Sequence, residues 1–283
     1  MLKPVFLSLL LPLVLLAGCG QTAETESPTP SELPAPEGEQ LLLRIVDGAE
    51  SGSLLLAGEG SAEVYTLTVT EETPVFLDGS PAASADLEDG MPVEVYYTDG
   101  IEEMWPAIPQ GITGLYAHSP GTAENPGGGY YDLCGLYLQV LDDLWSRDVG
   151  LNDGITCISV DLSEAPGDLT DGEKAAVAHR FTELHGDALS AFTYTYEELA
   201  EQGYIENADP ASGEMPQWRD GLLFRITPAE NAGNESCSLP TLRFDASKWR
   251  SALCAYGFSD CTAVWPELGP WTEYTINGGE FIS

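Results

Sequence analysis

The sequence predicts an α+β protein in which a small β-barrel precedes an α+β domain with a mixed or antiparallel sheet and two or three helices. Two observations lead to this prediction. Between residues 40 and 115, short runs rich in β-branched and aromatic residues alternate with Asp-Gly and other Gly-rich turns, which is typical of closely spaced strands. From residue 130 onward, stretches with helical periodicity alternate with strand-like runs. Alternation of this kind within one region favours an α+β layer structure.

The first 18 residues have the pattern of an export signal and are predicted to be removed. Lys3 precedes the apolar run Val5 to Leu16, which is too short for an ordinary membrane span and ends in small residues. The order Leu16-Ala17-Gly18-Cys19 resembles the lipobox of bacterial lipoproteins, in which the signal is cut before the cysteine. The resemblance implies that Cys19 carries lipid. The protein is then expected on the cell membrane, anchored through that lipid and facing the extracytoplasmic side.

Residues 19–39, the lipidated cysteine and the segment after it, are predicted to form a disordered tether. They consist mainly of Pro, Ser, Thr, Glu and Gly, so little apolar surface is available to offset the entropy lost on ordering. At about 3 Å per residue, such a segment could hold the folded part roughly 50 Å from the lipid.

The composition is strongly acidic, with 46 Asp and Glu against 10 Lys and Arg and a formal net charge of -36. This charge argues against nucleic acid as a partner and against electrostatic docking on anionic lipid. Solubility is the simplest consequence, and capture of cations or cationic peptides is the functional alternative.

Cysteine placement predicts neither a metal site nor a complete set of disulfides. Apart from Cys19, the chain has an odd set that cannot all pair internally: Cys134, Cys157, Cys237, Cys254 and Cys261. No Cys/His spacing of a metal site and no cofactor motif occurs in the sequence.

Residues 40–115 are predicted to fold as the β-barrel module. The segment Asp86 to Val95 resembles the "DL-x-x-G-x-x-V-x-V" segment of OB-like barrels found in lipoproteins of Gram-positive bacteria. The resemblance implies an OB-like fold. OB folds often bind oligonucleotides or sugars, but a nucleic-acid groove is basic, and Arg44 is the single basic residue between residues 40 and 110. A spacer or protein-binding module is therefore expected.

Residues 116–129 are rich in Gly and Pro and are predicted to form a linker before the α+β domain, residues 130–283. Its elements are predicted in the order helix, strand, helix, strand, short helix and terminal strands, with these bounds: Leu133 to Trp145, Ile155 to Val160, Thr170 to Leu184, Leu189 to Tyr194, Thr195 to Gly203, and 221 onward. Capping boxes begin the second and third helices. The two strands joined by a helix are expected to pair in parallel.

The sequence carries no catalytic motif such as G-x-S-x-G or H-E-x-x-H. His179 and His185 are six residues apart on one helix and therefore point to different sides. Asp161 and Ser163 follow a strand, where α/β proteins place ligands. A non-catalytic binding or interaction protein is the preferred interpretation. The alternative is a cell-envelope hydrolase with a site near Asp161 or His179.

Four basic side chains near the C-terminus are candidate ligand-binding residues: Arg225, Arg243, Lys248 and Arg250. Strand alternation places Leu222, Phe224 and Ile226 on an apolar sheet face and predicts that the basic side chains form a row on the other face. Guanidinium groups suit carboxylate or phosphate, so an anionic ligand, an envelope protein or a glycan is the expected partner. Alternatively, the row pairs with the surplus carboxylates of the protein.

The C-terminal segments Lys248 to Ser251, Asp260 to Ala263 and Phe281 to Ser283 resemble the ends of uncharacterised lipoproteins of Gram-positive anaerobes. This resemblance implies no activity.

Overall fold

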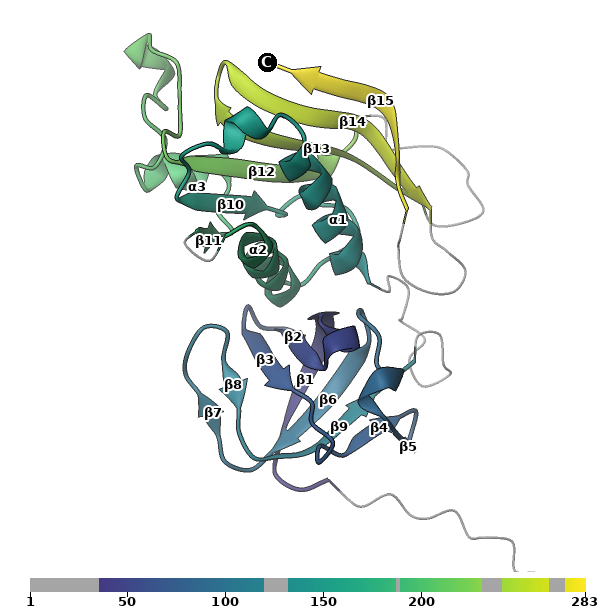
Figure 1. The fold of residues 1–283 in the computed structure, drawn as a ribbon. Helices are drawn as coiled ribbons and strands as arrows, with labels where there is room; N and C mark the ends of the chain where they lie inside the picture. Colours follow the sequence, from purple (N-terminus) through teal and green to yellow (C-terminus); the bar gives the residue numbers. More distant parts are fainter. Residues whose placement is uncertain (1–35, 120–131, 187–188, 231–240, 265–272) are drawn as a thin grey trace, which may run out of the picture. The chain divides into compact units, whose positions relative to one another are not determined.

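A computed structural model describes residues 36–119, 132–186, 189–230, 241–264 and 273–283 (Figure 1). Residues Ala35–Ser283 form one compact unit. The predicted signal with Cys19, most of the predicted tether, most of the predicted linker and Cys237 lie outside the described residues.

The N-terminal part, residues 36–119 and here called the β module, contains a mixed sheet of seven strands in the order β3-β2-β1-β6-β9-β4-β5. Neighbours are antiparallel except for the parallel pair β4 and β9. The strands are β1 (Glu39–Asp47), β2 (Ser53–Gly58), β3 (Val64–Thr68), β4 (Val75–Leu77), β5 (Ser80–Ala82), β6 (Pro92–Tyr97) and β9 (Ile112–Ala117).

The expected OB-like barrel is not observed, because β3 and β5 are the two ends of this sheet and no closed barrel occurs in the described residues. The strands nevertheless build a core through residues that alternate along each strand. Along β6, Val93, Val95 and Tyr97 are buried, while the residues between them are partly exposed. Leu43 and Ile45 of β1 contribute to the same core.

A separate two-stranded sheet, β7 (Ile101–Glu102) with β8 (Ile108–Pro109), meets the free edge of β3. The Thr66 N–H donates to the Ala107 carbonyl, and the Ala107 N–H donates to the Val64 carbonyl, each at 2.9 Å. These bonds satisfy part of an otherwise open strand edge and fix the segment between β7 and β8 beside β3.

The C-terminal part contains a six-stranded sheet in the order β11-β10-β12-β13-β14-β15. The first three strands are parallel and the others antiparallel, so the sheet is mixed, as predicted, and the expected parallel pair is present. The strands are β10 (Cys157–Asp161), β11 (Ser190–Phe192), β12 (Gly221–Pro228), β13 (Thr241–Ser251), β14 (Cys254–Val264) and β15 (Thr275–Ile282).

Three α-helices occur in the described residues, within the predicted number of two or three: α1 (Leu133–Ser146), α2 (Asp171–His185) and α3 (Tyr196–Glu201). Capping boxes begin α2, with Thr170 and Glu173, and α3, with Thr195 and Glu198. Each box satisfies backbone N–H groups that have no partner within the helix. No helix in the described part of the chain is long and apolar enough to cross a membrane.

The two faces of the six-stranded sheet carry different cores. On one face, apolar residues of α1 and α2 pack against Leu222, Phe224 and Ile226 of β12. On the other face, Leu199 of α3 and the buried Trp218 form a smaller cluster. Figure 1 shows α1 and α2 over one side of this sheet.

The first turn of α2 packs directly on the β module. A Cβ atom on Gly172 would lie 2.7 Å from the Ser61 carbonyl oxygen and 2.8 Å from that of Gly58. The neighbouring Glu173 Oε1 lies 2.9 Å from Arg44 Nε of β1. Glycine is therefore required at Gly172 for the close approach of two backbones.

Candidate functional site

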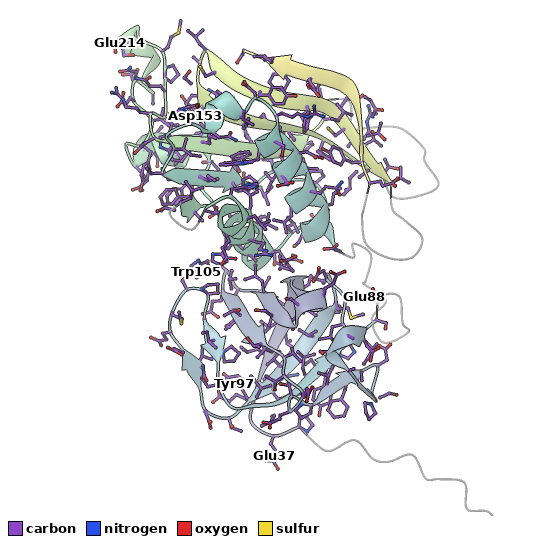
Figure 2. The ribbon with its side chains drawn as sticks, in the orientation of Figure 1. Glu37, Glu88, Tyr97, Trp105, Asp153 and Glu214 are labelled. Carbon is purple, nitrogen blue, oxygen red and sulfur yellow. The ribbon has the colours of Figure 1, made fainter. Side chains whose placement is uncertain are left out.

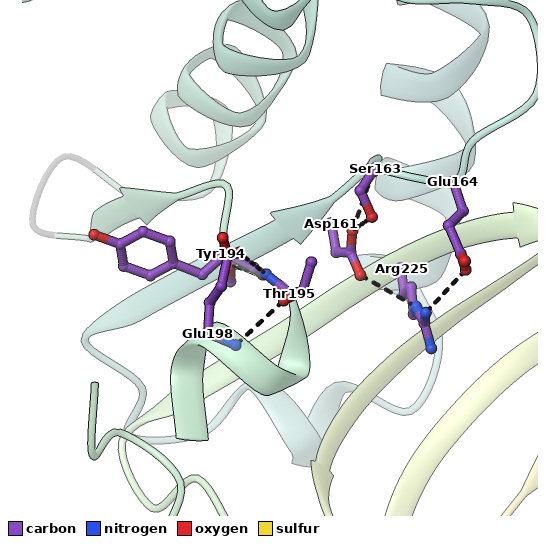
Figure 3. Close-up of polar contacts among 8 residues, drawn as sticks. Asp161, Ser163, Glu164, Tyr194, Thr195, Glu198 and Arg225 are labelled. Atoms are coloured by element: carbon purple, nitrogen blue, oxygen red, sulfur yellow. Dashed lines mark hydrogen bonds and ion pairs between the residues drawn. The ribbon is translucent and has the colours of Figure 1, made fainter. Parts of the chain in front are cut away.

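The predicted ligand position after β10 is an internal ion-pair cluster (Figure 3). Asp161 is 1% exposed, and its Oδ1 accepts from the Ser163 hydroxyl at 2.6 Å and the Ser163 N–H at 3.0 Å. Arg225 Nε lies 3.1 Å from Asp161 Oδ2, without the alignment of a hydrogen bond, and Arg225 Nη2 lies 3.1 Å from Glu164. One guanidinium therefore faces two carboxylates, which leaves little positive charge for an anionic ligand.

Beside this cluster, the polar groups at the start of α3 are also bonded within the protein. The buried Ser159 hydroxyl donates to the Tyr194 carbonyl at 2.7 Å. The Thr195 N–H donates to Glu198 Oε2 at 2.8 Å, and the Glu198 N–H donates to the Thr195 hydroxyl at 3.2 Å. Figure 3 shows the two bonds between Thr195 and Glu198. They hold the loop after β11 in place and account for its polar residues structurally.

Arg243 and Arg250 are likewise engaged. Arg243 Nη2 lies 2.5 Å from Asp260 Oδ1. Arg250 donates to three backbone carbonyls, those of Leu151, Asp153 and Arg219, at 2.7–2.9 Å. The contact of Arg243 fits the alternative in which the basic side chains pair with the surplus carboxylates. Arg250 differs, because its partners are backbone carbonyls.

The predicted row on one sheet face is wrong for Lys248. Alternation along β13 places Lys248 on the face of Phe244 and Ala246, against α1, whereas Trp249 points to the opposite face and contacts Tyr196. The Lys248 side chain is fully buried. Its ammonium, with three N–H donors, lies within hydrogen-bond distance of four oxygens at the end of α1 and in the turn after it: the carbonyls of Trp145, Arg147 and Asp148, and Asn152 Oδ1.

The end of α1 explains why Lys248 lies on the apolar face of the sheet. The last carbonyls of a helix have no partner within the helix and attract a cation. Lys248 provides that cation from the neighbouring strand. Burial lowers the pKa of Lys248 to about 8, so the ammonium is still mostly protonated at neutral pH.

The four described cysteines outside the signal are free thiols. Cys134, Cys157 and Cys261 are buried, and Cys254 is exposed. Burial raises the pKa of the Cys261 thiol to about 12. A nucleophilic thiolate is therefore disfavoured at Cys261. No group of potential metal ligands is found in the described residues.

His179 and His185 do lie on different sides of α2. His185 Nε2 is 3.1 Å from Asp142 of α1. His179 Nε2 is 3.4 Å from Glu183 Oε1 and lines a cavity of about 330 Å³ together with Ser51 and Ser53.

In the cavity at His179, no hydrogen bond joins the histidine to the hydroxyl of Ser51 or Ser53. The Ser51 hydroxyl donates to the Gly48 carbonyl at 3.0 Å and its oxygen accepts from the Ser53 N–H at 3.2 Å. Among the described residues, the polar partner of His179 Nε2 is Glu183. A nucleophile and a base within hydrogen-bond reach of each other define such a site, and these contacts do not form one.

The larger cavity lies on the β module and was not foreseen. This acidic groove has a volume of about 610 Å³. It is lined by Glu39, Glu63, Val64, Tyr65, Tyr97, Gly100, Ile101, Glu103, Met104, Trp105 and Ala107. The described lining therefore has three carboxylates, three aromatic rings and no basic side chain.

Two of the carboxylates are held by buried tyrosines. The Tyr65 hydroxyl donates to Glu63 Oε2 at 2.5 Å, and the Tyr97 hydroxyl donates to Glu39 Oε2 at 2.8 Å. Burial, followed by the bond to Glu63, raises the pKa of Tyr65. The bond to Glu39, followed by burial, raises the pKa of Tyr97. Both phenols stay protonated and orient carboxylates at the groove.

The third ring is exposed. Trp105 is 57% exposed and its neighbour Met104 is 51% exposed. The far side of Trp105 meets His179 edge-on, with ring centroids 6.3 Å apart, which helps to hold the indole at the groove. Exposed large apolar side chains that lie together are typical of a binding site.

One sequence signal marks the acidic groove. Met104-Trp105-Pro106 follows Glu102-Glu103 in a turn-rich segment, where an aromatic residue has no core to join. Tyr65 and Tyr97 carry no such signal, because each occupies an ordinary inward strand position.

Comparisons with protein-family models, with curated proteins and with solved structures found no match for this chain.

Proposed function

We propose that this chain is a lipid-anchored protein of the extracytoplasmic face that binds a ligand in the acidic groove and does not catalyse a reaction. The lipobox-like residues ending in Cys19 support the anchor. The single observation that carries the binding function is the groove itself, in which the exposed Trp105 lies with oriented carboxylates in a cavity of about 610 Å³. Small-molecule sites typically have volumes of roughly 300–1,000 Å³.

The anchor is tested by replacing the predicted lipidated residue. Cys19→Ala should prevent lipidation, so the protein should accumulate unprocessed or be released from the membrane. Fractionation followed by detection of the protein measures this outcome. Unchanged membrane fractionation and unchanged mass of the N-terminal peptide would contradict the anchor.

Binding is tested with the fragment Ala35–Ser283, which is compact by itself. A panel of small amines, sugars, carboxylates and phosphate esters is screened by the shift in the melting temperature, since a ligand that binds only the folded state raises it. A ligand of the groove should stabilise the wild-type fragment and lose its effect in Trp105→Ala. The matched comparison is Arg225→Gln, which removes a predicted anion-binding residue outside the groove. Compounds whose stabilising effect is lost in Arg225→Gln but kept in Trp105→Ala would contradict the groove as the binding site.

A hydrolase remains the second candidate, because the cavity at His179 brings a histidine, Glu183 and two serines together. Labelling of Ser51 or Ser53 by a fluorophosphonate probe, lost in His179→Gln, would support this candidate. We favour binding because Ser51 bonds to backbone groups of its own turn and His179 faces Glu183.

A further inference from the structure

The charge of the acidic groove favours a cation. Glu39, Glu63 and Glu103 come from three separate chain segments, and no basic side chain stands among the described lining residues. Elsewhere in the β module, the single arginine, Arg44, already pairs with Glu173 at 2.9 Å and lies 3.8 Å from Glu59. No basic side chain among the described residues of the β module therefore competes with a cationic ligand for the carboxylates of the groove.

The form of the carboxylates favours an N–H donor. The tyrosine hydroxyls occupy one oxygen of Glu63 and one of Glu39. A carboxylate has about four lone-pair sites, so acceptor capacity remains for an ammonium group. Charge-assisted bonds of this kind are about twice as strong as neutral ones.

The spaces between the carboxylates favour aliphatic carbon. Ile101 and Met104 present apolar surface to the groove, and the exposed Trp105 offers an indole face. An indole attracts an ammonium group as well as the methylene groups beside it.

The groove is extended. Trp105 and Tyr97 both line it, yet they lie well apart on the β module in Figure 2. A ligand that contacts both Trp105 and Tyr97 must therefore be extended.

We propose that the acidic groove binds a linear polyamine, with ammonium groups at the glutamates and the aliphatic segments along Ile101, Met104 and Trp105. This inference rests on the proposed function, because it names the ligand class of the same groove. A small molecule is favoured over a basic peptide because the volume of about 610 Å³ is that of a small-ligand cavity.

The experiment measures the binding of two linear ligands that differ in charge to the fragment Ala35–Ser283. Octane-1,8-diamine and octane-1,8-diol have the same chain length, and spermidine adds a third ammonium group. Isothermal titration at 150 mM salt should give one site for spermidine and for the diamine, with at least about tenfold weaker binding of the diol, since each charge-assisted bond contributes about a factor of ten.

Variants separate the groove from the general negative charge of the protein. Glu63→Gln and Trp105→Ala should each weaken spermidine binding about tenfold. Glu214→Gln is the matched control, because it removes one exposed carboxylate outside the groove and should leave the affinity unchanged. Circular dichroism and melting curves confirm that the variants fold.

Several results would overturn the proposal. Equal affinity for the diol and the diamine, with dependence on Trp105, would leave the groove as a binding site but remove the polyamine. A lysine-rich peptide that binds more tightly than spermidine and needs Trp105 would assign the groove to a protein partner. Binding at several sites that is unaffected by Trp105→Ala and Glu63→Gln would show non-specific attraction to a negatively charged protein. If no compound of the wider panel depends on Trp105, the proposed binding function fails as well.

Discussion

Asp132 shows how one buried carboxyl links stability to pH. It precedes α1, is 8% exposed, and accepts the Gly135 N–H at 2.9 Å. Burial, aided by Asp89 and Asp47, raises its pKa to about 7, while the bond from Gly135 acts in the opposite direction. Between about pH 4 and pH 7, the folded protein therefore retains a proton that the unfolded chain releases.

The sign of the effect follows from this difference. Because the folded state binds more protons in that window, its stability rises as the pH falls from 7 toward 4, by at most about 1.4 kcal/mol per pH unit for this group. Asp132→Asn keeps an acceptor for the Gly135 N–H and tolerates the left-handed backbone, with φ 53. Urea denaturation of the wild-type and variant fragments at pH 7, 6 and 5 measures the free energy of unfolding. As the pH falls, this free energy should increase for the wild type relative to the variant. Parallel pH dependences would contradict the raised pKa.

At the scale of elements, the end of α1 depends on a lysine from another strand. Lys248→Met keeps the side-chain volume but leaves the Arg147 carbonyl and Asn152 Oδ1 without their donor. The carbonyls of Trp145 and Asp148 keep their bonds from the Asn152 amide and the Leu151 N–H. The free energy of unfolding should fall by about 2–4 kcal/mol, because buried acceptors without partners are costly.

Chemical denaturation of the fragment Ala35–Ser283 measures this loss. Lys174→Met is the control, since Lys174 lies 3.5 Å from the exposed Asp171 on the surface of α2, and its loss should change stability by less than about 0.5 kcal/mol. A similar small effect for Lys248→Met would mean that water or other donors satisfy these oxygens.

The elements were largely predictable and the side-chain partners were not. Local signals were sufficient for α2 and α3, because each capping box lies within four consecutive residues. The parallel pairing of β10 and β11 followed from a helix between two strands. Lys248 was assigned to the wrong face because a lysine was expected at the surface, although continuous alternation from Phe244 places it on the apolar face. Its acceptors at the end of α1 are distant in sequence and gave no signal.

The same limit applies to the candidate site. Arg225, Arg243 and Arg250 were found from the sequence, but their carboxylate and carbonyl partners are set by the fold. The acidic groove was missed because Glu39, Tyr65 and Trp105 meet only through tertiary structure. The prediction of a barrel was wrong because the number of strands does not determine whether the two edges of a sheet pair with each other.

At the scale of the whole molecule, the contact of α2 with the β module can be tested at a single glycine. Gly172→Ala would stabilise a free helix or leave it unchanged. Here the new methyl group would meet backbone atoms of Gly58 and Ser61 at 2.7–3.0 Å, so we expect a loss of about 1–3 kcal/mol. Gly150→Ala is the control, because its Cβ would meet no atom closer than 3.9 Å.

Thermal unfolding of both variants measures the difference. A destabilised Gly172→Ala with an unchanged Gly150→Ala would confirm that α2 is pressed against the β2–β3 turn. If Gly172→Ala were neutral or stabilising, the two backbones would not be in contact.

The entry of the chain into β1 also has a practical consequence. The Thr113 hydroxyl donates to the Glu37 carbonyl at 2.6 Å, and Gly38 fits against the Tyr97 carbonyl so closely that a Cβ would lie 2.1 Å away. The chain is thus fixed just before Glu39, a wall of the groove, and Figure 2 shows Glu37 on the side of the module where Tyr97 lies. A fluorophore attached at Glu37 would lie next to Glu39, so this position offers an optical test of whether the groove takes up a ligand.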